Sequence, residues 1–217
     1  MIVIGVTGSI GMGKSTAGAM LEYLGVPVHD ADATVHDLLS TKSKARIAIG
    51  AAFPYFRYYA IYGRKNKNGV REINRQKLGA LVFKNPKERE KLENILHPLV
   101  RESQNDFIHK QHILGRNMVA LDIPLLFETA ADSRVDYTIT ASAPTHIQTA
   151  RVLARPDMTR QKFDAIRKTQ MHDIEKTARA DYVLPTGLGR AHTMKSLKKI
   201  IHDIQARQRP DDKQIAI

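Results

Sequence analysis

The chain has no cysteine and no tryptophan, and only 6% of its 217 residues are aromatic. Without cysteine there are no disulfides, cysteine-ligated zinc sites, iron–sulfur clusters or thiol nucleophiles, and this composition is compatible with the reducing cytoplasm in which we expect the protein to work. The low aromatic content and the lack of an RNP-type strand argue against a module that stacks nucleic-acid bases.

Long apolar segments are also missing. No segment approaches the roughly 18 uninterrupted apolar residues of a membrane span, so we expect no membrane partner. The first residues lack the basic region and long apolar stretch of a signal peptide. With 42% apolar and 26% charged residues, the composition is typical of a globular protein. The length predicts one sizeable domain with an inserted subdomain, and it leaves the oligomeric state open.

Acidic residues are in the minority, which gives a formal net charge of +12 and a pI near 9.9. Such a surface attracts polyanions such as nucleic acid, membrane surfaces or phosphorylated small molecules. The basic residues are spread along the whole chain without a dense arginine-rich block. A polyphosphate substrate therefore ranks above nucleic acid, and no nucleic-acid partner is expected.

Apolar runs separated by helical patterns predict an α/β fold with a parallel sheet. Strands are expected at 2–7, from 26, and at 118–123, 137–141 and 182–184. Helices are expected at 14–24, 75–83, from 86 onward, and at 145–154, 159–171 and 191–206. The stretch from 33 to about 109 reads as largely helical, with an aromatic segment at 53–59 and a basic turn at 63–69. The polar residues 208–217 are expected to form a flexible tail.

A complete phosphate-binding pattern, G-x-x-x-x-G-K-[ST], occupies residues 8–15 between an apolar strand and a helix. Its glycines let the backbone curl so that successive N–H groups point at phosphate oxygens. Lys14 is placed to reach the β- and γ-phosphates, and Ser15 to offer a hydroxyl to Mg²⁺. The helix adds its positive dipole end. The pattern predicts a P-loop that binds a nucleoside triphosphate.

Two aspartates, Asp30 and Asp32, follow the second predicted strand. Since ligands of open parallel sheets bind at the carboxyl ends of the strands, these carboxylates are expected near the phosphates. One can accept a proton from an attacking hydroxyl or organise water around Mg²⁺. Alternatively, Asp32 caps a helix that begins at Ala33. Asp122 ends another apolar run, as a Walker-B carboxylate does, or is simply a loop acid.

Basic residues of the second half offer less specific signals. Arg151 and Arg155 share a helix face, and Arg160 follows a break; they either clamp a phosphoryl group or form a solvated basic face. His97 precedes Pro98, so it is expected at a bend between helices, where it is equally a packing residue. The aromatic segment at 53–59 reads as core or lid packing rather than a base-stacking platform.

Taken together, these motifs resemble the dephospho-coenzyme A kinase family. The likeness rests on four features in the family's order: the P-loop; Asp30-Ala31-Asp32; Leu96-His97-Pro98-Leu99-Val100; and Asp122-Ile123-Pro124-Leu125-Leu126-Phe127-Glu128, followed by the arginine region and Ala180-Asp181-Tyr182-Val183. The matches span most of the chain. After this last motif the chain departs from the family, because it reads Pro185-Thr186-Gly187 where many relatives have an asparagine-containing turn.

The resemblance implies ATP-dependent phosphorylation of the ribose 3′-hydroxyl of dephospho-CoA, the final step of coenzyme A biosynthesis, with ATP and dephospho-CoA as partners and Mg²⁺ as cofactor. It implies a three-layer P-loop NTPase fold with a five-stranded parallel sheet. The nucleotide-binding core would comprise 1–32 and 115–210 with a lid around 151–175, and 33–114 would form a helical acceptor-binding subdomain.

The resemblance also implies roles for individual residues. Asp32 would be the general base, assisted in catalysis by Lys14 and by Arg155 of the lid. Acceptor binding would involve Asp32, Arg75 and His97, and Ser15 would contact the metal. The ATP-binding set would comprise Gly8, Gly11, Met12, Gly13, Lys14, Ser15, Thr16 and Arg151.

Two alternatives stay open at this stage. One is another small P-loop kinase that acts on a nucleoside or nucleotide. The other is a P-loop switch or nucleic-acid-associated ATPase. A GTPase would need an Asn-Lys-x-Asp motif, and the similar string Asn66-Lys67-Asn68-Gly69 lacks the acid. A metabolite kinase predicts turnover without nucleic acid, whereas the last class predicts salt-dependent binding to it.

Overall fold

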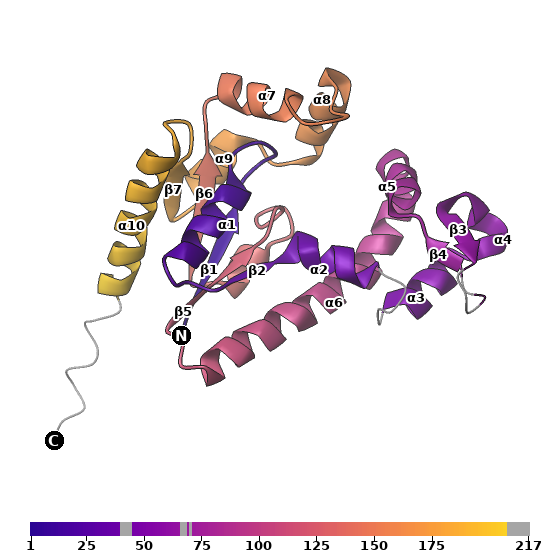
Figure 1. Ribbon diagram of the computed structural model, residues 1–217, viewed down its shortest axis with the longest axis horizontal. Coiled ribbons are helices and arrows are strands. Elements are labelled where there is room, and N and C mark those ends of the chain that lie inside the picture. The colour runs from indigo at the N-terminus through magenta and orange to yellow at the C-terminus, as the bar shows by residue number, and fades with distance from the viewer. Residues whose placement is uncertain (40–44, 66–68, 70, 208–217) are drawn as a thin grey trace. The chain divides into compact units, whose positions relative to one another are not determined.

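The computed structural model describes residues 1–39, 45–65, 69 and 71–207, and the chain divides into two compact units (Figure 1). The first unit comprises Met1–His29 and Lys110–Ile217, and the second comprises Asp30–His109. The tail expected at 208–217 and positions 66–68 of the expected basic turn lie outside the described residues.

A five-stranded parallel sheet forms the centre of the first unit, which confirms the predicted fold class. Its strand order is β2-β5-β1-β6-β7. The strands are β1 (Ile2–Thr7), β2 (Val28–Asp30), β5 (Met118–Asp122), β6 (Tyr137–Ser142) and β7 (Tyr182–Pro185). Every residue of β5 is buried, which explains its continuous apolar sequence. Because β5 pairs directly with β1, with Val6 opposite Asp122, this carboxylate lies on the strand next to the P-loop.

Helices cover both faces of this sheet and make the predicted three layers. On one face, α1 (Lys14–Tyr23) and α10 (Arg190–Arg207) lie side by side (Figure 1) and pack on Ile2, Ile4 and Val6 of β1. Gly5 faces the other way, where a Cβ atom would meet Leu126 and Val135 at 3.1 Å. That opposite layer contains η2 (Ala131–Arg134) and α9 (Asp173–Arg179), whereas α7 (Thr145–Leu153) and α8 (Arg160–Thr169) come between β6 and α9 in the chain.

The second unit has its own apolar core, in which Ala45, Ile49, Phe53 and Leu78 are fully or almost fully buried. Its elements are α2 (Ala31–Leu38), α3 (Ala45–Ala52), α4 (Tyr55–Tyr58), η1 (Tyr59–Ile61), β3 (Tyr62–Lys65), β4 (Arg71–Ile73), α5 (Arg75–Lys84) and α6 (Pro86–Ile113), the last of which continues past the unit boundary. Part of the aromatic segment serves this core, since Phe53 is buried. Phe56 projects outward and is 85% exposed.

Some sequence-based expectations in the second unit are wrong. The stretch from 33 to 109, expected to be largely helical with a basic turn at 63–69 and no strong strand, contains an antiparallel pair, β3 with β4. No bend separates two helices at His97, because α6 runs through Pro98 as one 28-residue helix. Asp32 does not cap the next helix: Asp30 is the N-cap, and its Oδ1 accepts the Ala33 N–H at 2.9 Å.

The helix expected at 159–171 ends earlier, and a further helix follows it. Thr159 is the N-cap of α8, and its hydroxyl accepts the Lys162 N–H at 3.2 Å. The helix ends at Thr169, and α9 begins at Asp173. Two residues between these helices contact other parts of the first unit. Gln170 accepts a hydrogen bond from the Ile10 N–H of the P-loop, and Met171 donates its N–H to Glu128.

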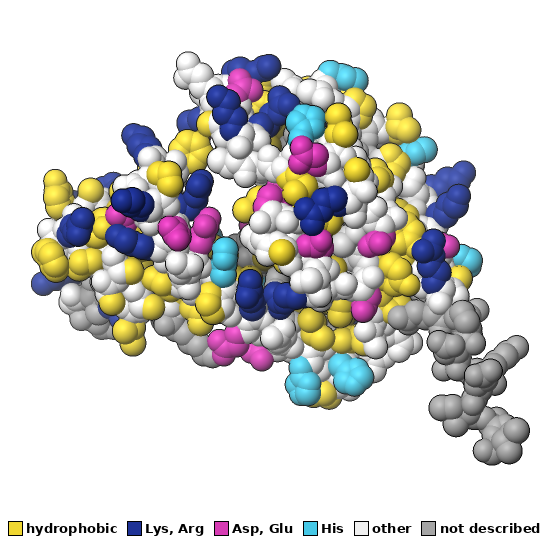
Figure 2. All heavy atoms as spheres, turned by 180° about the vertical axis from the view of Figure 1, so that it is seen from behind, with side chains coloured by type: hydrophobic (Ala, Val, Ile, Leu, Met, Phe, Trp, Pro, Cys, Tyr) yellow, Lys and Arg dark blue, Asp and Glu magenta, His cyan; other side chains and the backbone are white. Residues whose placement is uncertain are grey.

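The described part of the chain contains no helix that is both long and apolar enough to cross a membrane. On the face shown in Figure 2, lysine and arginine side chains are scattered among acidic, apolar and histidine side chains and form no continuous basic patch.

Candidate active site

The loop between β1 and α1 holds the phosphate-binding pattern, and its glycines occupy positions that other residues cannot fill. Gly11 and Gly13 have φ angles of 79° and 94°, in the left-handed region that disfavours a Cβ atom. A Cβ on Gly11 would lie 2.4 Å from Val152 Cγ2 of α7, and one on Gly8 would lie 2.9 Å from the Ala141 carbonyl oxygen. The loop therefore needs glycine both for its curvature and for its close contact with the neighbouring elements.

The loop ends at the N-terminus of α1, which is well suited to bind an anion. Gly13 is the N-cap and offers no side-chain oxygen, and the first helical turn contains no acidic residue. The N-terminal N–H groups of a helix lack intrahelical acceptors and carry its positive dipole end. Lys14, Ser15 and Thr16 begin this turn, and Ser15 is exposed. Phosphate oxygens are the natural ligands of such an arrangement.

Lys14 and Asp122 form the central ion pair of this site. Their Nζ and Oδ1 atoms are 2.5 Å apart, and both side chains are largely buried. The pairing follows from the topology, since Asp122 ends β5 beside the strand that leads into the P-loop. The ammonium can bind phosphate oxygens, and the carboxylate can hold the water shell of a divalent cation. Asp122 was a weaker sequence candidate than Lys14, and the structure brings the two together.

Arg151 lies on α7 and contacts the turn that follows β7. Its Nη2 atom donates to the Thr186 carbonyl at 2.6 Å, and its Nη1 atom donates to the Thr186 hydroxyl at 3.1 Å. That hydroxyl donates in turn to the Met12 carbonyl of the P-loop at 2.6 Å. The arginine is therefore linked to the phosphate-binding loop through Thr186, in the turn where the chain departs from the resembled family.

The other two arginines of this region differ in their surroundings. Arg155 is exposed just beyond the end of α7. Arg160 starts α8 and pairs with Asp164 one turn later, with 3.3 Å between Nε and Oδ2. Arg160 would therefore have to give up this ion pair before it could bind a phosphoryl group.

Three further sequence candidates belong to the second unit. Asp32 is exposed in the first turn of α2, two residues after the end of β2. Arg75 is the first residue of α5, and its guanidinium contacts the His36 ring of α2. His97 is exposed on α6. Arg75 therefore borders the helix that carries Asp32.

Sequence reasoning missed several polar residues around the P-loop, because no motif marks them. Gln148 and Gln170 both contact Ile10, and the glutamine residues lie 138 and 160 positions away from it in the chain. Lys176, in the second half of the chain, is completely buried and pairs with Glu128. Only the fold reveals these partners.

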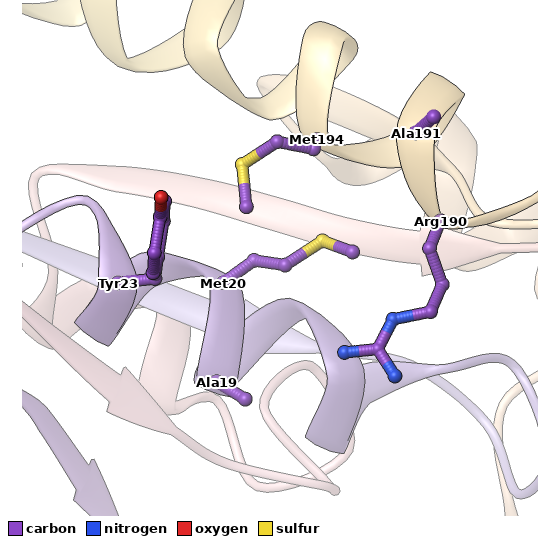
Figure 3. A pocket seen from close by; sticks show the side chains of 6 residues that line it. All are labelled: Ala19, Met20, Tyr23, Arg190, Ala191 and Met194. Carbon is purple, nitrogen blue, oxygen red and sulfur yellow. The ribbon is translucent and has the colours of Figure 1, made fainter.

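A groove on the first unit lies between α1 and α10, away from the first turn of α1. Its volume is about 400 Å³, and its lining residues are Ala19, Met20, Tyr23, Arg190, Ala191 and Met194. The Met20 and Met194 side chains extend towards each other across the groove, and the Arg190 guanidinium lies at one end (Figure 3). Its lining is mostly apolar, so it does not have the character of a triphosphate site.

Comparison with known proteins places the sequence close to one family. The family model for dephospho-CoA kinase matches residues 2–188. The dephospho-CoA kinase of Paramagnetospirillum magneticum is 50% identical over 178 residues, which are 81% of this chain and 78% of that protein. The dephospho-CoA kinase of Rhizobium etli is 43% identical over 207 residues, or 95% and 96% of the two chains.

Solved structures give the same likeness in three dimensions. The crystal structure of TT1252 from Thermus thermophilus is 30% identical and superimposes with a TM-score of 0.76, covering 94% of this chain and 97% of that one. The dephospho-CoA kinase from Campylobacter jejuni is 24% identical with a TM-score of 0.65, over 94% and 98% of the chains. The latter likeness is one of fold.

Proposed function

Since the chain belongs to the dephospho-CoA kinase family, we propose that it transfers the γ-phosphoryl group of ATP to the ribose 3′-hydroxyl of dephospho-CoA, the final step of coenzyme A biosynthesis. The observation that carries the proposal is the family match over residues 2–188, which includes the complete P-loop and Asp122.

ATP would bind through the P-loop and the first turn of α1. The loop amides and the dipole of α1 would bind the phosphates, and Lys14 would neutralise charge on the β- and γ-phosphates. Lys14 would then exchange its contact with Asp122, 2.5 Å in length, at least in part for phosphate oxygens. The positions assigned to ATP are Gly8, Gly11, Met12, Gly13, Lys14, Ser15, Thr16 and Arg151.

The residues beside the P-loop fit Mg²⁺. This ion keeps several waters and usually takes only one or two protein ligands together with substrate phosphates. Ser15 offers an exposed hydroxyl at the start of α1, and Asp122 offers a carboxylate at the end of β5. When bound, the ion would neutralise charge on the phosphates as it accumulates in the transition state.

The second unit would bind the acceptor. Asp32 would orient the ribose hydroxyl and accept its proton as the oxygen attacks the γ-phosphorus in line with the leaving ADP. Arg75 would bind an anionic group of dephospho-CoA, and His97 would donate a hydrogen bond to it. The exposure of Asp32 and His97 is compatible with contact to a substrate.

The segment 151–175 would act as a lid over the phosphates. Arg155 would approach the transferring group, where a guanidinium stabilises the charge of the transition state. Arg151 would contribute near the nucleotide while it holds the turn at Thr186, with 2.6 Å between Nη2 and the Thr186 carbonyl oxygen. Asp32 for the acceptor and Lys14 with Arg155 for the phosphoryl group thus make the proposed catalytic set.

An ADP-release assay with ATP and Mg²⁺ tests the proposed reaction across dephospho-CoA, adenosine, AMP, uridine and cytidine. We expect turnover with dephospho-CoA, the appearance of coenzyme A by mass spectrometry, and no turnover with the other four. Turnover of a nucleoside or of AMP, with none of dephospho-CoA, would assign the chain to the small nucleoside or nucleotide kinases instead.

A further inference from the structure

We infer that Gln148 and Gln170 act as positioning residues that hold the P-loop in its ATP-binding shape through hydrogen bonds to the backbone carbonyl and N–H of Ile10. Gln148 Nε2 donates to the Ile10 carbonyl oxygen at 2.8 Å, and Gln170 Oε1 accepts the Ile10 N–H at 3.0 Å. A backbone N–H can only donate and a carbonyl can only accept, so the two carboxamides have opposite roles. We call this pair of hydrogen bonds the glutamine clamp.

The clamp acts on two successive peptide groups of the loop. The Ile10 N–H belongs to the peptide group shared with Ser9, and the Ile10 carbonyl belongs to the one shared with Gly11. In a trans peptide the C=O and the N–H point in opposite directions. Holding the Ile10 carbonyl towards Gln148 therefore directs the Gly11 N–H away from it, and this amide is one of those proposed to bind phosphate.

Each glutamine is itself held firmly. Gln148 lies on α7 and is only 3% exposed, so its side chain has little freedom. Gln170 follows α8, and the next residue, Met171, donates its N–H to Glu128 Oε1 at 2.8 Å. The same carboxylate oxygen lies 2.9 Å from Nζ of the buried Lys176. The glutamine clamp therefore rests on ordered groups of the first unit at both ends.

A flexible glycine-rich loop gains ligand affinity when its bound shape is already formed before the ligand arrives, because less ordering is left to be done on binding. The glutamine clamp supplies such ordering at Ile10, directly beside Gly11 with its left-handed backbone. Gln148 shares α7 with Arg151, and Gln170 lies within the proposed lid segment 151–175 that also contains Arg155, so the clamp joins this segment to the phosphate-binding loop. It is expected to affect ATP far more than the acceptor.

Changing each glutamine to glutamate separates the two roles. Q170E keeps an accepting oxygen, whereas Q148E loses the donor and sets a carboxylate against a carbonyl oxygen. We expect Q148E to weaken binding of a non-hydrolysable ATP analogue roughly tenfold, and Q170E to change it less than about threefold. Q205E, at an exposed position of α10 outside the proposed lid, is the control for added negative charge and should leave the affinity unchanged. Isothermal titration calorimetry measures all three.

Neutral variants cover the case in which Q148E does not fold. Q148M and Q170M each remove one hydrogen bond without adding charge, and each should weaken analogue binding about fivefold. The control Q205M should not weaken it. Q170E should then restore the affinity that Q170M loses. In turnover assays the KM for ATP should rise, with the KM for dephospho-CoA unchanged.

Equal losses in Q148E and Q170E would overturn the inference, because they would report charge and not the direction of a hydrogen bond. Unchanged affinity in Q148M and Q170M would overturn it as well. Of these expected results, only the KM values in turnover assays with dephospho-CoA depend on the proposed function. Analogue binding is measured without any acceptor, so a failure to phosphorylate dephospho-CoA would refute the proposed function and leave the clamp test intact.

Discussion

The two units of this chain are stabilised in different ways. In the first unit, hydrogen bonds between residues far apart in sequence converge on the P-loop: the Thr186 hydroxyl donates to the Met12 carbonyl across 174 positions, and Gln170 meets Ile10 across 160. In the second unit, an apolar cluster around Ile49 and Phe53 forms the core. Its side-chain hydrogen bonds join residues closer in sequence, such as the Asn74 cap of α5 across three positions and the Tyr58–Glu88 bond across 30.

This difference fits the proposed roles of the two units, a phosphate donor site on the first and an acceptor site on the second. A phosphate donor site depends on the directions of backbone N–H groups, and these directions have to be fixed by specific polar partners. An acceptor site depends more on the shape of a surface, which many apolar sequences can support. The proposed donor site is therefore recognisable from the chemistry of one short motif, whereas the proposed acceptor residues are assigned only through the family resemblance.

Asp32→Asn should give the largest effect and tests whether the second unit contributes to the chemistry as well as to binding. Asparagine keeps the size of the side chain but cannot accept the hydroxyl proton. We expect kcat to fall by roughly 10²–10⁴-fold with the affinity for ATP unchanged. Steady-state assays and binding of an ATP analogue measure the two quantities.

Asp37→Asn on the same helix is the matched control for Asp32→Asn. Asp37 is an exposed acid, and its Oδ1 atom lies 3.8 Å from Nδ1 of the neighbouring His36. Its removal should leave kcat unchanged. Near-normal turnover in Asp32→Asn would exclude Asp32 as the general base and would restrict the proposed chemistry to the first unit.

Lys176→Met should be the most destabilising of the charge changes. It removes an ion pair of the first unit and is compared below with a matched change at an ion pair of the second unit. Lys176 is fully buried, and its Nζ lies 2.9 Å from Glu128 Oε1 and 3.1 Å from the Pro124 carbonyl oxygen. Removing it leaves the Glu128 carboxylate without its cation, and breaking a buried pair in this way costs about 3–5 kcal/mol of unfolding free energy. Urea denaturation followed by circular dichroism measures the loss.

The matched change in the second unit is Lys91→Met. Lys91 is 45% exposed on its side chain, and Glu88 retains a hydrogen bond from the Tyr58 hydroxyl at 3.0 Å after the lysine is gone. We therefore expect a much smaller change in the urea midpoint. Equal shifts in the two variants would contradict the view that the buried Lys176–Glu128 pair contributes more to stability than the partly exposed Lys91–Glu88 pair.

The sequence predicts the first unit well because its signals are local. The apolar run at 118–123 becomes β5, and the glycine pattern leads from β1 into α1. The glutamine clamp is not predictable from the sequence, because Gln148 lies 138 positions from Ile10 and no motif around it indicates this contact. In the second unit, the pair β3 and β4 is short and mostly polar, so periodicity does not reveal it.

Two local signals in the second unit were also misjudged. Pro98 removes only one backbone donor, and long helical stretches on both sides keep α6 continuous. Asp30 and Asp32 are both suitable caps, and the end of β2 at Asp30 decides between them. Helix and strand limits of this kind depend on tertiary packing, which one sequence does not encode in a short window.

The smallest expected effect concerns the dependence of stability on pH, and it involves one tyrosine hydroxyl in each unit. The Tyr182 hydroxyl donates to Asp203 Oδ2 at 2.6 Å in the first unit, and the Tyr62 hydroxyl donates to the Phe53 carbonyl at 2.6 Å in the second. Burial, with the bond to Asp203, raises the pKa of Tyr182 to about 12. Burial also raises the pKa of Tyr62 above its usual value.

A tyrosine in the unfolded chain loses its proton near pH 10, whereas folded Tyr182 keeps its proton to about pH 12. Between these values the unfolded state binds fewer protons, so stability falls as pH rises, and the contribution is fully present below pH 10. Tyr182→Phe should flatten this fall between pH 10 and 12, and Tyr62→Phe should do so to a smaller extent. Urea denaturation at pH 9 and pH 11 measures both slopes. If neither variant changes the slope, the titration of these two hydroxyls does not contribute to alkaline unfolding in either unit.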